Sequence, residues 1–246
     1  MKSIRIDKYL ADMGKGTRSE LKKMIRGGAV TIDGVVVKKP EEKVIPGEQK
    51  VFLAGIEVGY SRMEYYVLNK PAGCVSATED NVHKTVMDYI ISDRKSELFP
   101  VGRLDLDTEG LLLITNDGPL AHALLSPRHH VEKTYIATLN APAMEEMVEQ
   151  FENGIEIGEK NPTLPAKLKI LSDRQAEITI SEGKFHQVKR MFHAVGREVV
   201  ALRRIQMGSL RLEESLLPGK YRALTEEELT ALRMEAGMSG NDRNRN

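Results

Sequence analysis

Several features that define whole classes of protein are scarce or missing in this chain. It has one cysteine, Cys74, in 246 residues, which excludes an internal disulfide and fits a reducing cytoplasm. No stretch approaches the roughly 20 apolar residues that cross a bilayer. The segment 1–10 lacks the apolar core of a secretory signal peptide. We therefore expect a cytoplasmic protein with no membrane partner, long enough for one small and one larger domain.

An excess of charge of one sign is also missing, because 36 Lys and Arg balance 36 Asp and Glu. This balance argues against an indiscriminate binder of polyanions. The distribution is uneven, however. Residues 1–39 hold ten basic and four acidic residues, and residues 181–222 hold nine and four. Two basic segments on a neutral chain favour a localised binding site for a polyanion.

The first 60 residues predict a compact module of two short helices and a hairpin. Apolar residues in 6–13 have the spacing of one helix face. Thr17 followed by Glu20 is a capping-box signature that begins a second helix. An Asp-Gly pair at 33–34 between two Val-rich runs is a strong hairpin signal. This order of elements, with the sequence Arg-Ile-Asp-Lys-Tyr-Leu at 5–10, resembles the RNA-binding module of ribosomal protein four of the small subunit.

The basic face of the second predicted helix has three interpretations. It is an ordinary solvated face, a surface that contacts phosphates, or part of a DNA-reading helix-turn-helix. The last is disfavoured because no polar set for reading bases stands out and the hairpin follows at once. The resemblance implies RNA docking by these basic residues: Arg5, Arg18, Lys22, Lys23 and Arg26.

The larger part of the chain is strand-rich, with helices interspersed. Its pattern predicts an α+β fold with a mostly antiparallel mixed sheet. We place the RNA-binding module at 1–60, the larger domain at 63–233 and a disordered polar tail at 237–246. The first predicted strand begins at 65 and ends in a Pro/Gly turn at 71–73. The other predicted strands are 111–114, 133–139, 154–158, 166–171, 176–182 and 199–207. The predicted helices lie near 86–90 and at 120–125, 144–151, 185–195 and 225–234.

The segment 100–110 carries three acids and Arg103, and it directly precedes the predicted strand 111–114. Charged groups beside a core strand are costly unless they are paired. The residues alone allow a solvated loop, a calcium loop, or a loop that presents a carboxylate for covalent catalysis. The calcium interpretation fails because its last ligand position holds Asn116 instead of a bidentate glutamate.

The adjacent His129 and His130 raise the question of a metal site. Neighbouring residues on a strand point in opposite directions, and Cys74 has no partner cysteine. We therefore expect no metal site. The loop residues Arg128, His129 and His130 are predicted to contact RNA.

Three motifs occur in a fixed order behind the RNA-binding module. They are Gly-Arg-Leu-Asp at 102–105, Glu-Lys-Thr-Tyr at 132–135, and Glu-Gly-Lys-Phe-His-Gln-Val-Lys-Arg-Met-Phe at 182–192. Together they resemble the pseudouridine synthases of the RsuA type, which act on small-subunit ribosomal RNA. The likeness extends over nearly the whole chain, including 68–71 and 218–222.

The resemblance implies a role for each matching residue. Asp105 corresponds to the catalytic aspartate, and Lys189 to the basic residue that pairs with it. Tyr135 corresponds to the tyrosine that stacks on the target base and assists in removing a proton. Arg103 corresponds to the arginine of the aspartate motif, which helps to fill the space left by the flipped base. The motif at 182–192 adds further predicted substrate-binding residues: Lys184, His186, Gln187 and Arg190.

The implied chemistry is an isomerisation of uridine within the RNA. The N-glycosidic bond breaks, and the base rotates and reattaches through C5 to the same ribose. An ionised carboxylate attacks the sugar or removes its 2′ proton; both routes stay open. No redox step occurs and no water is activated, so neither metal nor cofactor is required. The expected partner of this monomer is ribosomal RNA or a small-subunit assembly intermediate.

Two other functions fit parts of the same pattern. The first is a synthase of the same family that acts on large-subunit ribosomal RNA. The second is a non-catalytic RNA-binding protein of ribosome assembly, in which both basic segments would persist. The intact set Asp105, Tyr135 and Lys189 favours an enzyme, since a pure binder has no need of it.

Overall fold

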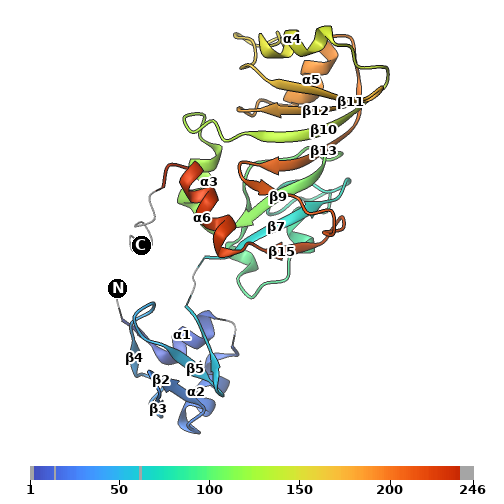
Figure 1. The fold of residues 1–246 in the computed structure, drawn as a ribbon. Coiled ribbons are helices and arrows are strands. Elements are labelled where there is room, and N and C mark those ends of the chain that lie inside the picture. Colours follow the sequence, from blue (N-terminus) through green and yellow to red (C-terminus); the bar gives the residue numbers. More distant parts are fainter. Residues whose placement is uncertain (1–2, 14, 61–62, 239–246) are drawn as a thin grey trace. The chain divides into compact units, whose positions relative to one another are not determined.

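The structure, a computed structural model, describes residues 3–13, 15–60 and 63–238. The chain forms two compact units, one ending at Met63 and one beginning at Glu64 (Figure 1). Within the described ranges, no helix has both the length and the apolar character needed to cross a bilayer. Most of the predicted tail, 239–246, lies outside the described residues.

The first unit has the predicted order of two helices followed by a hairpin. A Thr17–Glu20 capping box begins the second helix, as predicted, and the turn at Asp33 and Gly34 has positive φ angles of 50° and 83°. The buried core joins both helices to the sheet through Leu10, Leu21 and Val30. The helices are α1 (Ile6–Asp12) and α2 (Arg18–Arg26). The strands are β1 (Ile4–Arg5), β2 (Val30–Ile32), β3 (Val35–Val37), β4 (Lys43–Val44), β5 (Val51–Leu53) and β6 (Ile56–Glu57).

The second unit is built on a mixed sheet in the order β11-β12-β10-β13-β9-β7-β15, with β14 beside β13 and β8 beside β9. Among the described strands of this sheet only β13 and β9 pair in parallel, so the predicted mostly antiparallel sheet is confirmed. The strands are β7 (Tyr65–Lys70), β8 (Phe99–Pro100), β9 (Glu109–Thr115), β10 (Lys133–Leu139), β11 (Lys167–Ser172), β12 (Gln175–Ile180), β13 (Val199–Met207), β14 (Leu210–Arg211) and β15 (Tyr221–Ala223).

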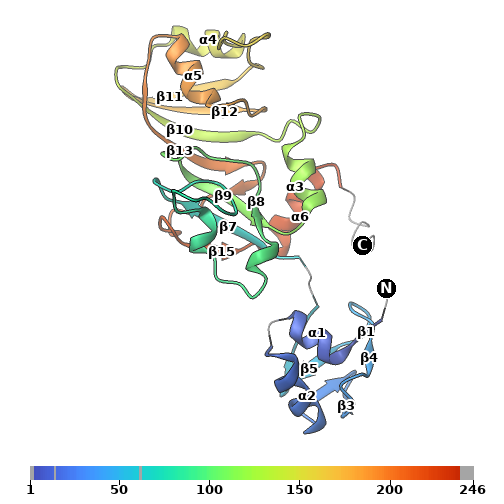
Figure 2. The ribbon, with the colours of Figure 1, turned by 180° about the vertical axis from the view of Figure 1, so that it is seen from behind.

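Helices cover both faces of this sheet, as the two opposite views show (Figures 1 and 2). Strand β9 sends Leu112 and Ile114 into one apolar cluster, and Leu111 and Leu113 into the other. Burial on both faces explains why this segment is a continuous apolar run instead of an alternating one. The helices of the first cluster are α4 (Glu146–Glu152), α5 (Gln187–Ala194) and the 3₁₀ turn η1 (Val86–Tyr89). Those of the second are α3 (Gly118–Leu125) and α6 (Glu226–Glu235). A further 3₁₀ turn, η2, spans Lys95–Glu97.

Two of the differences between the predicted and the observed elements have a clear physical cause. The predicted strand 154–158 is wrong, because this segment forms its hydrogen bonds with a loop residue. The Ile155 amide donates to the Thr163 hydroxyl, and the Thr163 amide donates back to the Ile155 carbonyl, both over 2.9 Å. The predicted helix 185–195 begins two residues later, since His186 adopts a left-handed conformation (φ 49°, ψ 34°) that a helix cannot include.

Candidate active site

The loop that carries Asp105 lies between β8 and β9. Hydrogen bonds from β7, and from the segment that follows β7, hold the main chain of this loop. Lys70, fully buried at the end of β7, donates to the carbonyl oxygens of Asp105 and Thr108 over 3.0 and 2.8 Å. The Ser76 hydroxyl donates to the Leu104 carbonyl over 2.9 Å and accepts from the Leu104 amide over 3.0 Å. These bonds fix the backbone on both sides of Asp105 and leave its side chain 27% exposed.

The Asp105 carboxylate faces two basic side chains from the segment around α5. Its Oδ2 lies 3.1 Å from Lys189 Nζ, and its Oδ1 lies 3.5 Å from His186 Nε2. Lys189 also donates to Asp107 Oδ1 over 2.6 Å. One ammonium thus bridges two carboxylates of the same loop, and the structure brings Asp105 and Lys189 together as the sequence predicted.

Charge and burial act in opposite directions on Lys189. Burial alone would lower its pKa, but the hydrogen bonds to Asp107 and Asp105 outweigh that effect and leave the pKa of Lys189 raised. The Lys189 hydrogen bond also lowers the pKa of Asp107 below its ordinary value. The ammonium therefore keeps its charge at neutral pH and presents it to the Asp105 carboxylate.

The packing of α5 explains why Lys189 reaches this loop. Val188, Met191 and Phe192 are buried against the sheet, and Lys189 is placed at the side of that buried stripe. The Lys184 amide donates to the Gln187 side-chain oxygen over 2.9 Å and fixes the chain just before the helix. The start of α5 is thus anchored by apolar packing and by Gln187.

Tyr135 lies on β10 and is 7% exposed. It belongs to the same apolar cluster as Leu104 and Val188, the residues next to Asp105 and Lys189 in sequence. The Arg204 guanidinium carbon lies 6.0 Å from the centre of the Tyr135 ring, within the range of a cation–π contact. Hence Tyr135 is on the face of the sheet that carries the Asp105–Lys189 pair.

Arg204 on β13 is a residue that the sequence did not single out. It is 2% exposed, and its Nε donates to the Leu111 carbonyl of β9 over 2.7 Å. Its Nη2 is buried without a hydrogen-bond partner among the described residues. Arg204 therefore links the strand after the Asp105 loop to the Tyr135 ring.

Besides His186, three of the predicted substrate-binding residues have intramolecular partners in the structure. Lys184 Nζ donates to the Asn161 and Pro162 carbonyls over 3.2 and 3.0 Å. The Gln187 amide donates to Glu182 over 2.9 Å, and Arg190 donates to Glu159 over 2.8 Å and to the Ile157 carbonyl. These bonds hold the loop before β11 against the start of α5. Contact of these side chains with RNA stays a prediction.

Arg103 and the loop 126–130 differ in their position relative to the Asp105–Lys189 ion pair, called the Asp105 pair below. Arg103 is exposed and adjoins Leu104 in the same loop as Asp105. Arg128, His129 and His130 are exposed as well, but they follow α3, which packs into the other apolar cluster. Within the described part of the chain, no hydrogen bond or ion pair joins Arg128, His129 or His130 to the Asp105 pair.

The described residues include no group of three or more His, Cys, Asp or Glu side chains arranged to hold a metal ion. The adjacent His129 and His130 therefore do not form part of such a group in this structure. Metal independence of the reaction stays a prediction.

The predicted RNA-docking residues of the first unit fall into two groups. Arg5 binds the buried Asp7 carboxylate through two hydrogen bonds of 3.0 Å, and Arg18 adds a third of 3.2 Å. Burial alone would raise the pKa of Asp7, but these guanidinium bonds leave it lowered. The second group lies on α2, where Lys23 and Arg26 are exposed and Lys22 is half-buried.

The chain matches the family model described as RNA pseudouridylate synthase over residues 64–194. It belongs to that family. Residues 4–50 match the S4 domain. The family assignment confirms the predicted resemblance and the enzyme class, and the S4 match confirms the kind of module that precedes the synthase domain.

Similar proteins cover nearly the whole chain. An RNA pseudouridine synthase of Bacillus subtilis, YtzG, described as uncharacterized, is 47% identical over 234 residues, which is 93% of this chain and 98% of that protein. The ribosomal small subunit pseudouridine synthase A of Escherichia coli K12 is 41% identical over 93% of this chain and 100% of its own length. A crystal structure of a pseudouridylate synthase, 42% identical, covers 93% of this chain and 99% of its own, with a TM-score of 0.67.

Proposed function

We propose that this member of the RNA pseudouridylate synthase family converts one specific uridine of small-subunit ribosomal RNA to pseudouridine. The observation that carries the proposal is the Asp105–Lys189 ion pair of 3.1 Å, on the sheet face that also holds Tyr135. The 41% identity to ribosomal small subunit pseudouridine synthase A supports the choice of RNA.

In this proposal Asp105 is the residue that reacts with the ribose. It attacks the anomeric carbon or removes the 2′ proton, and both routes require the ionised carboxylate. The Lys189 ammonium lies 3.1 Å from Asp105 Oδ2, and the attraction between two opposite charges at this distance is stronger in a partly dry site than in water. The glycosidic N1–C1′ bond breaks and the C5–C1′ bond forms, with cleavage of the ester bond to Asp105 in the first route or return of the 2′ proton in the second. C5 loses a proton and N1 gains one, so the product is an isomer of uridine.

Tyr135 and Arg103 have roles at the base in the same proposal. Tyr135 stacks on the flipped uracil and assists in removing the C5 proton. Arg103, exposed in the loop next to Asp105, fills the space that the flipped base leaves. Extruding a base costs a few kcal/mol, which stacking and phosphate contacts must offset.

The remaining parts of the proposal concern the setting of the reaction. The partner is ribosomal RNA or a small-subunit assembly intermediate, bound with help from the exposed Lys23 and Arg26 of the S4 domain. The enzyme works as a monomer in the cytoplasm, a compartment that suits the single, buried Cys74.

The test is to map pseudouridine in ribosomal RNA by chemical labelling and primer-extension stops, in cells with and without the gene. We expect one stop in small-subunit RNA that disappears with the gene and returns with the wild-type gene. If the stop that disappears lies in large-subunit RNA, that RNA is the substrate and the proposed substrate is wrong. The absence of any change would reject the proposed activity.

A further inference from the structure

Phe185 is an aromatic residue whose exposure has no structural explanation within the described part of the chain. It is 68% exposed, whereas phenylalanine is usually buried. One face of its ring stacks on the His186 imidazole, with 3.8 Å between ring centres and 18° between planes. With one face covered and two-thirds of the residue exposed, the opposite face of the phenyl ring is open to solvent.

The stacked pair lies directly beside the proposed catalytic carboxylate. His186 Nε2 is 3.5 Å from Asp105 Oδ1, so a single imidazole separates the phenyl ring from the reacting group. The left-handed backbone of His186 sets this arrangement, because it keeps His186 and Phe185 out of α5. An ordinary helical start at Phe185 would direct both side chains differently.

We propose that the open face of Phe185 binds an unpaired base of the RNA strand, next to the uridine held at Asp105. This inference rests on the proposed function and adds a specificity determinant to it. An aromatic ring near a flipped nucleotide provides a stacking surface for a neighbouring base, and such stacking tolerates any base because each has a π face.

The surroundings of Phe185 fit a nucleic-acid strand better than an apolar partner. Lys189 adjoins Asp105, and Arg103 is exposed in the same loop. Phe185 also lies in the basic segment 181–222, which holds nine basic and four acidic residues. Stacking on an aromatic ring together with phosphate contacts from basic side chains is the usual combination for binding single-stranded RNA.

The experiment uses the full-length enzyme and a small-subunit RNA fragment that contains the mapped uridine. The variants are Phe185→Ala, Phe185→Trp and Met234→Ala. Met234 is a matched control, because it is 71% exposed on α6, which packs on the other sheet face. Each variant is measured for thermal stability, for RNA Kd, and for kcat and KM of pseudouridine formation.

We expect Phe185→Ala to raise Kd and KM by about 5- to 150-fold, the range for loss of one stacked base. The kcat should change little, because stacking acts on the ground state and the transition state alike. Phe185→Trp should restore tight binding, and Met234→Ala should match the wild type. Equal values of Kd and KM for Phe185→Ala and Met234→Ala would overturn the inference.

A second measurement identifies the base. The nucleotide on either side of the target uridine is replaced, one at a time, by an abasic residue. At one of the two positions, the abasic residue should lower the affinity of the wild type as much as Phe185→Ala lowers the affinity for intact RNA. Combining that abasic residue with Phe185→Ala should lower the affinity no further than either change alone. If the losses of affinity from the abasic residue and from Phe185→Ala add up at both positions, the inference is overturned and the proposed function stays intact. A wild-type enzyme that forms no pseudouridine would reject the proposed function and the inference with it.

Discussion

The ammonium group of Lys70 donates a hydrogen bond to the main-chain carbonyl of Asp105 over 3.0 Å, across 35 residues of sequence. Lys70 is fully buried, and its other acceptors are the carbonyls of Pro71, Leu106 and Thr108. Burial lowers the pKa of Lys70, but these carbonyl oxygens offset part of the cost of a buried charge. Lys70 thus holds the loop through its backbone, and the Asp105 carboxylate stays available to Lys189.

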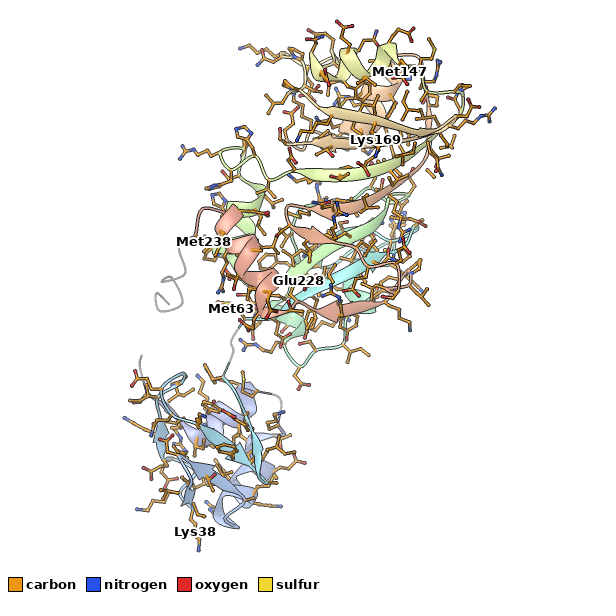
Figure 3. All side chains as sticks on the ribbon, in the orientation of Figure 1. Lys38, Met63, Met147, Lys169, Glu228 and Met238 are labelled. Carbon is orange, nitrogen blue, oxygen red and sulfur yellow. The ribbon has the colours of Figure 1, made fainter. Side chains whose placement is uncertain are left out.

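Replacing Lys70 by Met should therefore impair the reaction without removing a group that touches RNA. We expect Lys70→Met to lower the free energy of unfolding by about 1–3 kcal/mol, because buried carbonyls lose their donor. The kcat should fall more than Kd rises, since Asp105 is no longer held in place. Lys169→Met is the control: Lys169 is exposed on β11 (Figure 3). Unchanged kcat in a stable Lys70→Met protein would contradict a positioning role.

The buried Lys133 side chain should make the free energy of unfolding depend on pH, and a variant of this residue can isolate its contribution. Burial, with help from the nearby positive charge of Arg204, lowers the pKa of Lys133 to about 8. The unfolded chain binds this proton up to about pH 10.4. Between these pH values the unfolded state therefore holds more protons, and stability rises with pH.

The measurement compares the wild type with Lys133→Met across pH 7 to 10.5 by denaturant unfolding. Between these pH values the free energy of unfolding of the wild type should rise, relative to that of the variant, by up to about 3 kcal/mol. The contributions of the other titrating groups cancel in this difference. Below pH 8 the difference should be constant. A difference that stays flat through pH 10 would show that Lys133 keeps its ordinary affinity for the proton.

The basic face of α2 should control the salt dependence of RNA binding. Changing Lys22, Lys23 and Arg26 together to Gln should lower the slope of log K against log salt by about 2, if each contacts a phosphate of single-stranded RNA. The control removes the same charge from the synthase domain, at the exposed Lys95, Lys160 and Lys169. Equal slopes for the wild type and the α2 variant would assign these residues to an ordinary solvated surface.

Local signals in the sequence predicted most of the framework. The Thr17–Glu20 capping box, the Asp33-Gly34 turn and the apolar run that forms β9 depend on neighbouring residues alone. The Asp105–Lys189 pair joins residues 84 positions apart, so only the resemblance to a family could place them together.

The structure adds contacts that no local signal encodes. Lys70 and Arg204 bind main-chain carbonyls, which have no sequence signature, at separations of 35 and 93 residues. Gly110 has a φ of 103°, and a Cβ there would collide with the Arg204 backbone. The wrong strand at 154–158 arose similarly, because Thr163 satisfies the Ile155 backbone from outside any sheet.

The proposed reaction depends most on the Asp105 carboxylate, and one comparison of two variants tests its role directly. Asp107→Asn is the matched control, since Asp107 lies in the same loop and also binds Lys189. Single-turnover formation of pseudouridine is measured on the mapped RNA fragment for both variants, together with RNA Kd. We expect Asp105→Asn to reduce turnover to background with Kd nearly unchanged, and Asp107→Asn to remain active. Substantial turnover by Asp105→Asn, or its loss in Asp107→Asn alone, would contradict the assignment of the reacting carboxylate to Asp105.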